Sequence, residues 1–455
     1  MKDKMNILLP IETINREIDY KLVLAAYLAG KGYNVYVGQH NFIDQLLPRL
    51  DGGIYIGKTM FKSLVGSDKG DIYKVLRKQN FDFIYLNEEG AVFKGEEDDW
   101  RQMLNFQYDM KLFNANDIVC TWGEFQLEHD QKRNFNNVPI KATGHPRFDL
   151  YKQEWNFLFK DEIIKLKQKY KDFILVNGNF GLANHGQGVS YVFSSAGHYN
   201  VKDVSKRMDR IGFYTHSTKQ LVEMVKLTHQ LAIHYPSKII IYRPHPSENI
   251  DYYKSIFKGV NNIIVEHRGS VNAWILAAKF IIHDGCTTAI EAALGGKVVI
   301  NYKTAEDLKH DIWLPNQMGI KTSSFNEVIN IIDNYKESRN VKTYTSKAKN
   351  LLQNFETNSF KAFFSILDYK LNEMNHHKFE NKLTQKFISW QYFKNKLKVK
   401  IASVIPQKKQ AIQYHRNKFN GFDEQNINLK IDLLEKNFDK SITLKYYNPF
   451  LIKIT

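Results

Sequence analysis

The sequence is poor in cysteine and in long apolar runs. Only Cys120 and Cys286 occur among 455 residues, and they stand far apart. Two such residues exclude a disulfide framework or a zinc site built from several cysteines, and they fit a reducing compartment. No apolar run reaches the roughly 18 residues that a membrane-spanning helix needs. The apolar run near the N-terminus is too short for a signal peptide, so we expect a cytoplasmic protein.

Acidic residues are outnumbered by basic ones, 48 to 64, which gives a net charge of +16. The excess is concentrated between Lys378 and Lys418, where eleven Lys or Arg accompany one acid, Glu380. Aromatic residues interrupt this segment, among them Trp390 and Phe393. Such a mixture is typical of a helix that lies on an anionic membrane, although a solvated basic helix would have the same composition. No nucleic-acid-binding module is recognisable, and we expect no nucleic-acid partner.

Short apolar runs alternate with helical patterns over the first three quarters of the chain. This alternation predicts an α/β fold with parallel sheets covered by helices on both faces. The first unit is a strand at 6–10, an amphipathic helix at 20–31 and a second strand from 34. Further strands are expected at 53–56, 81–86, 118–121, 173–176, 239–242, 280–282 and 297–300.

Composition and turn signals divide the chain into four parts. We predict two doubly wound domains, at 1–155 and 156–340, and a returning helical segment at 341–375. A basic helical tail would occupy 376–455. The polar stretch from Gly186 to Gly212 is expected to be a long, flexible insertion near the cleft.

Two strand ends in the second half carry groups that suit a phosphate. The strand at 239–242 runs into Arg243 and His245, and the strand at 280–282 is followed by Thr287 and Thr288 at the start of a short Ala-rich helix. If the two loops leave adjacent strands, a cation, an imidazole, two hydroxyls and free backbone N–H groups converge on one crevice. In a purely structural β/α repeat the same residues would only cap helices and satisfy backbone groups.

Two adjacent carboxylates follow the strand at 81–86. Glu88 and Glu89 precede Gly90 at a carboxyl strand end, where α/β proteins place their sites. A carboxylate there can accept a proton from a reacting hydroxyl, although a solvated acidic turn would look the same. We prefer Glu88 over Glu89 as the base, because Glu89 adjoins the glycine and suits the turn.

A glycine-containing loop follows the strand at 173–176. Its backbone can approach a ligand or the other domain, because glycine adds no side chain. Its polar residues Asn179, Asn184 and His185 are candidate cleft contacts.

Three motifs resemble, in type and in their order along the chain, those of bacterial surface-carbohydrate-biosynthesis enzymes. These enzymes are inverting GT-B glycosyltransferases that use CMP-activated ulosonic acids such as sialic acid or Kdo. In chain order, the motifs are the triplet 88–90, His245-Pro246 and the segment 284–288. The resemblance covers roughly residues 5–340 and implies a GT-B-like fold, in which two Rossmann-type domains face a cleft.

By this resemblance, each candidate residue has a role. His245, Pro246, Thr287 and Thr288 would surround the CMP phosphate, and Arg243 would add charge. Glu291 would hold ribose hydroxyls, and Glu88 or Glu89 would be the general base.

The resemblance also implies the partners of the reaction: a CMP-sugar donor, a glycan acceptor, no cofactor and no metal ion. Cys286-Thr287-Thr288 replaces the usual serines, which leaves the donor open. A CDP-polyol phosphotransferase of the teichoic-acid type shares the His-Pro motif and is the alternative enzyme. A non-catalytic scaffold of glycan assembly at the membrane is the alternative of another class.

Overall fold

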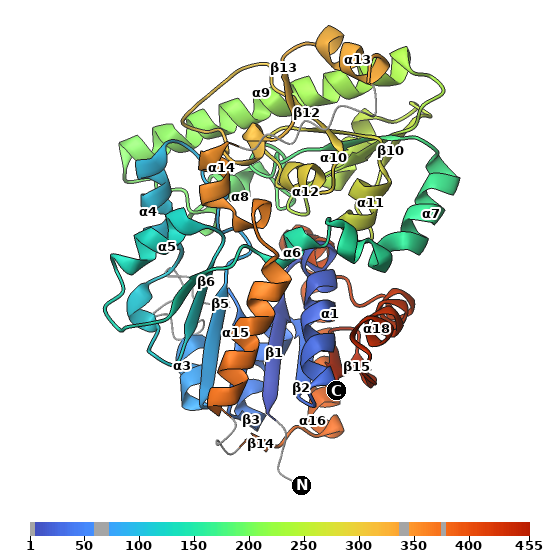
Figure 1. The fold of residues 1–455 in the computed structure, drawn as a ribbon. Helices are drawn as coiled ribbons and strands as arrows, with labels where there is room; N and C mark the ends of the chain where they lie inside the picture. Colours follow the sequence, from blue (N-terminus) through green and yellow to red (C-terminus); the bar gives the residue numbers. More distant parts are fainter. Residues whose placement is uncertain (1–4, 59–71, 336–344, 375–378) are drawn as a thin grey trace.

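Two β-sheets, one above the other in Figure 1, form the core of the molecule. The computed structural model describes residues 5–58, 72–335, 345–374 and 379–455, so Lys378 lies outside the described residues. The strands expected from the apolar runs are present within one or two residues of their predicted bounds. The expected GT-B-like architecture, two Rossmann-type domains facing a cleft, is therefore confirmed.

The first sheet has the order β15-β16-β2-β1-β4-β5-β6-β7. Strands β2 to β7 of that order are parallel, and β16 runs antiparallel to β2. The chain reverses its direction of travel across the sheet between β1 and β4, which makes this gap a topological switch point. The bounds are β1 Asn6–Ile11, β2 Asn34–Gln39, β4 Gly53–Gly57, β5 Phe81–Leu86, β6 Ile118–Thr121, β7 Ile140–Ala142, β15 Leu444–Asn448 and β16 Leu451–Ile454.

The second sheet is parallel throughout and has the order β10-β9-β8-β11-β12-β13. This is the strand order of dinucleotide-binding Rossmann domains, with its switch point between β8 and β11. The expectation that the strands before His245 and Thr287 are adjacent is wrong, because β8 lies between β9 and β11. The bounds are β8 Ile174–Asn177, β9 Ile240–Arg243, β10 Ile263–Val265, β11 Phe280–His283, β12 Val298–Tyr302 and β13 Ile320–Thr322.

Helices cover both faces of each sheet (Figure 1). The stretch 186–212 is more regular than expected: it contains α8 and the start of α9, which runs 31 residues across the top of the second domain in Figure 1. The α-helices described in the two domains are α1 Ile14–Gly30, α2 His40–Asp44, α3 Ile72–Lys78, α4 Glu97–Gln107, α5 Glu124–Gln131, α6 Pro146–Asp149, α7 Lys160–Tyr170, α8 Val189–Val192, α9 Val204–His234, α10 Ile250–Ile256, α11 Val271–Ala277, α12 Thr288–Leu294 and α13 Phe325–Asp333.

The described chain beyond residue 345 returns to the first domain. Helix α15 (Ser359–Met374) packs on α1, where the rings of Tyr27 and Phe364 stack with centroids 3.9 Å apart. The tail contains the helices α16 (Gln385–Ser403), α17 (Pro406–Lys418) and α18 (Glu424–Phe438). It then ends in the hairpin β15–β16, which extends the first sheet and was not predicted.

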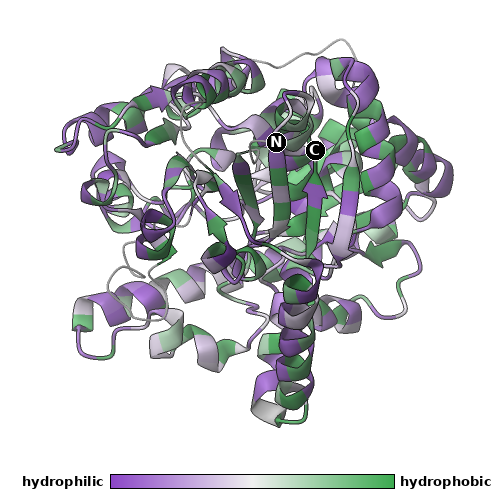
Figure 2. Cartoon of the chain, turned by 90° about the horizontal axis from the view of Figure 1, so that it is seen from below, coloured by the Kyte–Doolittle hydropathy of each residue, from purple (hydrophilic) through white to green (hydrophobic). Residues whose placement is uncertain are grey.

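Hydrophobic residues concentrate on the strands and on the inner faces of the helices, and hydrophilic ones on the outer faces (Figure 2). This distribution gives each sheet a buried core, as expected for parallel strands covered on both sides. No helix in the described parts of the chain is long and apolar enough to cross a bilayer.

The two domains are joined beside the cleft by a buried carboxylate. Asp19 on α1 accepts hydrogen bonds from Asn272 Nδ2 at 2.8 Å and from the Ser270 hydroxyl, both in the second domain. Lys430 on α18 donates to the same carboxylate at 2.7 Å and lies 2.9 Å from Glu162 on α7. One acidic side chain thus connects the first domain, the second domain and the tail.

Candidate functional site

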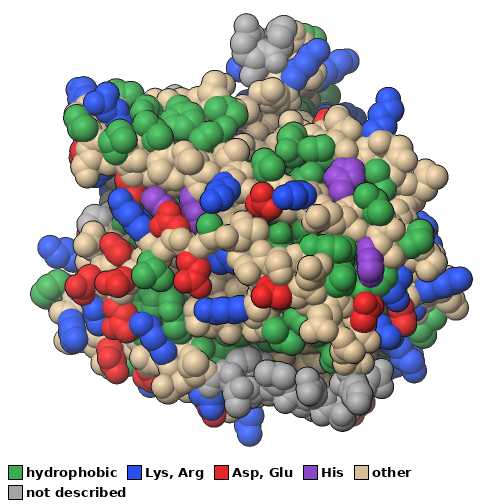
Figure 3. Space-filling model, turned by 90° about the horizontal axis from the view of Figure 1, so that it is seen from above, with side chains coloured by type: hydrophobic (Ala, Val, Ile, Leu, Met, Phe, Trp, Pro, Cys, Tyr) green, Lys and Arg blue, Asp and Glu red, His purple; other side chains and the backbone are tan. Residues whose placement is uncertain are grey.

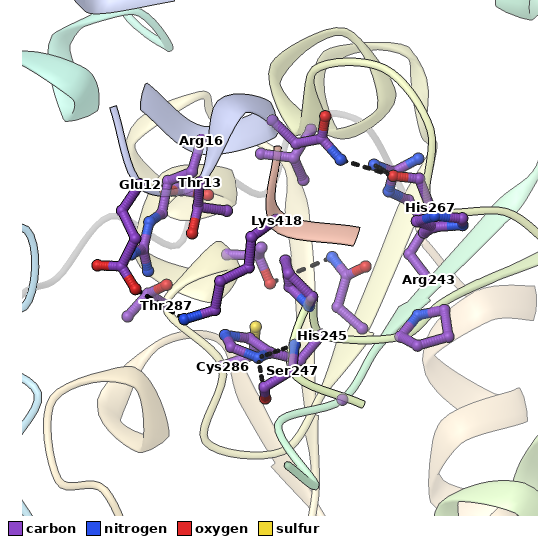
Figure 4. A pocket seen from close by; sticks show the side chains of 18 of the residues that line it. Glu12, Thr13, Arg16, Arg243, His245, Ser247, His267, Cys286, Thr287 and Lys418 are labelled. Atoms are coloured by element: carbon purple, nitrogen blue, oxygen red, sulfur yellow. Dashed lines mark hydrogen bonds and ion pairs between the residues drawn. The ribbon is translucent and has the colours of Figure 1, made fainter. Parts of the chain in front are cut away.

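A cavity of about 270 Å³ lies between the two domains, at the carboxyl ends of both sheets (Figure 4). The first domain supplies the loop after β1 and Glu89 after β5, and the second supplies the loops after β8, β9, β10 and β11. Both switch points therefore open onto the same space, the position that ligands prefer in open α/β sheets. Of the predicted residues, the lining contains Glu89, Arg243, His245, Pro246, Thr287, Thr288 and Glu291.

His245 is held in one tautomer by its own loop. Its Nδ1 accepts the backbone N–H of Ser247 at 3.2 Å and lies 2.7 Å from the Ser247 hydroxyl. Burial, assisted by the nearby Arg16 charge, lowers the pKa of His245 to about 4. The ring is therefore neutral at physiological pH, and its proton is on Nε2, the nitrogen that remains to donate to a ligand.

Hydroxyl groups lie beside His245. Thr287 is the N-cap of the seven-residue helix α12, and its side chain makes no capping bond with any described residue. Thr288 Oγ1 accepts a hydrogen bond of 3.1 Å from Asn177 Nδ2 at the end of β8. Asn177 also lines the cavity. The last residue of β8, the strand between β9 and β11, therefore lies between the loops that follow those two strands and is hydrogen-bonded to the second of them.

Arg243 reaches the cavity, but its guanidinium is engaged elsewhere. Its Nη1 donates to the Arg268 carbonyl at 3.0 Å, and its Nη2 donates to the carbonyls of His267 and Gly269 at 3.3 Å each. Burial lowers its pKa to about 10, and the group stays charged. Arg243 thus supports the loop that brings His267 to the cavity, and its charge acts on the site through space.

Two cations that the sequence analysis did not assign to the site, Arg16 and Lys418, line the other side of the cavity, and Lys58 lies behind them. Glu12, directly after β1, pairs with Lys58 at 2.7 Å and with Lys418 of the tail at 2.7 Å. Arg16 at the start of α1 lies 3.5 Å from Glu89. Glu12 and Arg16 follow a switch-point strand and were open to prediction on that ground. Lys418 comes from α17, and nothing in the basic tail indicated that it enters the cleft.

The two adjacent glutamates have opposite surroundings. The Glu88 side chain is 2% exposed and points into the first domain, toward Lys21 Nζ at 3.5 Å, His145 Nε2 at 3.3 Å and Arg147 Nη1 at 3.7 Å. Burial opposes its ionisation, but His145, Lys21 and Arg147 together hold the pKa of Glu88 well below its usual value.

Glu89 instead lines the cavity, and its side chain is 52% exposed. Partial desolvation of the Glu89 carboxylate in the cleft would raise its pKa, but the positive charges of Lys58 and Arg16 outweigh this effect and lower the pKa. Glu89 is therefore ionised at neutral pH and accessible. The preference for Glu88 as the base is corrected: Glu88 is an anchor in the interior of the first domain, and Glu89 is the carboxylate that a substrate can reach.

Glu291 links the cavity to that interior. It is buried on α12, and its Oε1 lies 3.6 Å from Arg147 Nε. Burial raises the pKa of Glu291 despite the nearby charge of Arg147. Arg147 also donates to the Glu88 backbone carbonyl at 2.9 Å, so one buried guanidinium connects the second-domain side of the cleft with the segment that carries Glu89.

Of the loop after β8, Asn177 and Gly178 line this cavity, but the three predicted contacts Asn179, Asn184 and His185 lie outside its lining. Asn179 and His185 line a second cavity of about 340 Å³, which shares Ser247 with the first. His185 stacks on Tyr414 of α17, with ring centroids 5.2 Å apart. Asn184 is outside the described lining of both cavities and donates to the Asn249 carbonyl at 2.9 Å.

Comparisons with known proteins give structural similarity alone. No family model and no curated protein matches this sequence. The UDP-GlcNAc 2-epimerase of Methanocaldococcus jannaschii, solved with UDP-GlcNAc and UDP, is 12% identical with a TM-score of 0.48 over 80% of this chain and 99% of that chain. The UDP-GlcNAc 2-epimerase of Neisseria meningitidis is 12% identical with a TM-score of 0.43, over 80% of this chain and 100% of that chain. A structure of the wall teichoic acid polymerase TagF is 8% identical with a TM-score of 0.47, over 82% of this chain and 90% of that chain.

Proposed function

We propose that the chain is an inverting glycosyltransferase that moves a CMP-activated ulosonic acid, such as sialic acid or Kdo, onto a surface polysaccharide or lipid-linked glycan. The observation that carries this proposal is the cavity between the two switch points. It is lined on one side by the ionised, accessible carboxylate of Glu89 and on the other by the neutral imidazole and the hydroxyls of the second domain. A base and a phosphate-binding group thus line one space, as a single displacement requires.

The donor phosphate is bound by His245, Thr287 and Thr288 in this proposal. The Nε2–H of His245 and the two threonine hydroxyls donate to the phosphate oxygens, and the Arg243 charge adds to the field. The Ser247 hydroxyl donates to His245 Nδ1 and fixes the orientation of the ring. Arg16 and Lys418 supply further positive charge as the phosphate leaves. Glu291 accepts hydrogen bonds from the ribose hydroxyls. The reaction needs no metal ion in this scheme, because cationic side chains stabilise the leaving group.

The transfer step uses Glu89 as general base. The acceptor hydroxyl attacks the anomeric carbon, and its proton passes to the Glu89 carboxylate. The bond between the anomeric carbon and the phosphate oxygen breaks, its electron pair stays on the phosphate, and CMP leaves. One displacement inverts the configuration at that carbon.

The first experiment measures nucleotide binding. Calorimetry with CMP, CDP, UDP and GDP should show the tightest binding with CMP. His245→Ala removes one hydrogen bond to a charged group and should weaken CMP binding by about 10- to 150-fold, which corresponds to about 1.5–3 kcal/mol. Equal CMP affinity of the two folded proteins would remove the phosphate assignment.

The second experiment measures transfer from a panel of CMP-sugars. Glu89→Gln should lower turnover by roughly 10²- to 10⁴-fold and leave CMP affinity nearly unchanged, because the base acts in the transition state. Glu128→Gln, at an exposed position on α5, is the matched control and should be silent. Binding of CDP-glycerol with polyol-phosphate transfer would favour the phosphotransferase. A folded protein that binds no nucleotide and tolerates Glu89→Gln would favour the scaffold.

A further inference from the structure

Helix α16 packs on the first domain with one face, and its opposite, apolar face is exposed among the residues that the structure describes. Ile388 is buried, the Tyr392 ring lies 5.9 Å from Phe450, and Asn395 Nδ2 donates to Gln45 Oε1 at 2.9 Å. These three residues are spaced by four and three, so they form the face that packs on the first domain. From Lys396 to Ile401 every residue is exposed, which means that the helix has left the body of the molecule.

The uncovered face is a continuous apolar stripe. Its members are spaced by three or four residues, so they share one side of the helix. They are Trp390 (60% exposed), Phe393 (55%), Leu397 (46%), Ile401 (57%) and Val404 (75%). Val404 is the C-cap and keeps helical backbone angles, so the stripe continues to the end of α16. Five large exposed apolar side chains on one unpartnered helix face indicate an interaction site.

The charges beside the stripe identify what covers it. At 100° per residue, Lys394 and Lys398 lie on one flank and Lys396 and Lys400 on the other, and all four are exposed. The described part of the basic segment contains one acid, Glu380, which pairs with Lys382 at the start of the segment. On the face shown in Figure 3, by contrast, basic and acidic side chains are interspersed. An apolar stripe with lysines along both edges is the pattern of a helix lying in the headgroup layer of an anionic bilayer.

We propose that α16 and α17 form an arm that docks on an anionic lipid surface, with the stripe of α16 in the bilayer interface and its lysines at the headgroups. Helix α17 packs along α16 and carries Tyr414 and Lys418 into the cavity. The docked arm therefore keeps the cleft close to the lipid surface. If the proposed transfer reaction holds, this arrangement brings the cleft within reach of lipid-linked acceptors in that surface. The docking itself does not depend on the transfer reaction.

The test is co-sedimentation of the full chain with vesicles of phosphatidylglycerol and phosphatidylcholine, and with vesicles of phosphatidylcholine alone. The chain should sediment with the first and stay in solution with the second. Each lysine near such a surface contributes on the order of fivefold to binding. Replacing Lys394, Lys396, Lys398 and Lys400 together by Gln should weaken binding on the order of 100- to 1000-fold. Phe393→Gln, Leu397→Gln and Ile401→Gln combined should abolish vesicle binding, although this variant keeps every charge.

The matched control changes four exposed lysines elsewhere, Lys132, Lys141, Lys165 and Lys258, to Gln. It removes the same charge and should leave vesicle binding within about threefold of the unchanged chain, because these residues lie away from the stripe. In addition, Trp390 fluorescence should be quenched by brominated lipids, and Trp390→Phe should remove that component.

Three results would overturn the proposal. The first is a charge effect that is not specific to the arm: the variant with all four arm lysines replaced sediments with vesicles as the unchanged chain does, or the control variant loses as much vesicle binding as the arm variant. The second is a dimer in analytical ultracentrifugation that the threefold apolar variant dissociates, which would assign the stripe to a second copy. The third is tight binding of polyuridylate that depends on the four lysines and not on the apolar residues, which would assign the arm to nucleic acid.

Discussion

Glu88→Gln removes one negative charge from a fully buried cluster and should destabilise the first domain. Removing one member of a buried ion pair costs about 3–5 kcal/mol. The lower end applies here, because Lys21 keeps Glu17 at 2.6 Å and Arg147 keeps Glu291 at 3.6 Å. We therefore expect a loss of about 3 kcal/mol. At roughly 2–4 °C per kcal/mol for a domain of 150–250 residues, the midpoint of thermal unfolding should fall by roughly 6–12 °C.

Glu89→Gln is the natural comparison, because it makes the same chemical change one residue away. Its half-exposed side chain pairs with Arg16 at 3.5 Å, and such pairs contribute about 0–1 kcal/mol. Scanning calorimetry of both variants and of the unchanged protein, at neutral pH and low salt, measures the difference. Equal midpoints for the two variants, or a larger loss for Glu89→Gln, would refute the division between a buried, structural carboxylate at Glu88 and an accessible one at Glu89.

Three further predictions concern stability. Burial raises the pKa of Glu248 to about 7, so the folded state binds this proton more tightly than the unfolded state between about pH 4.5 and 7, and stability falls as pH rises through that window. Glu248→Gln should remove this component, and its thermal midpoint should drop less between pH 5 and pH 8 than that of the unchanged protein. A Cβ at Gly123 would lie 2.2 Å from the Asn350 carbonyl in helix α14 (Ser346–Leu351), so Gly123→Ala should cost about 1–3 kcal/mol and increase proteolysis near α14, whereas unchanged proteolysis would contradict this packing. Lys430→Met leaves Asp19 buried without its cation and should cost about 3–5 kcal/mol, measured by thermal unfolding; a neutral effect would show that the other partners of Asp19 suffice.

The positions of the strands and of the donor-side residues were predictable because they depend on local sequence. An apolar run of four to six residues that ends in polar groups marks a buried parallel strand and the edge of its sheet. That rule located His245, Thr287, Thr288 and Glu89. It could not give the order of the strands, which is set by the crossovers, and so it missed β8 between β9 and β11.

The remaining part of the site depends on contacts between distant segments. The ion pair between Glu12 and Lys418 spans 406 residues and exists only because α17 returns to the cleft. Arg243 was assigned to the phosphate from its residue type, but its donors are taken by three carbonyls of the loop after β10. Neither feature has a signature in the local sequence. Both follow from which loop happens to be within hydrogen-bonding distance in the folded chain.

Strand β16 pairs with β2, so that Ile454 faces Val35 across the sheet. During synthesis, β2 is complete long before its outer neighbour exists. At translation rates of about 5–20 residues per second, the gap lasts roughly 20–80 s. The second domain, whose strands lie between residues 174 and 322, can fold within that time. The apolar edge of β2 meanwhile stays open to other chains. The position of β16 in the sequence thus leaves the nascent first domain with an unpaired strand edge for the whole of this interval.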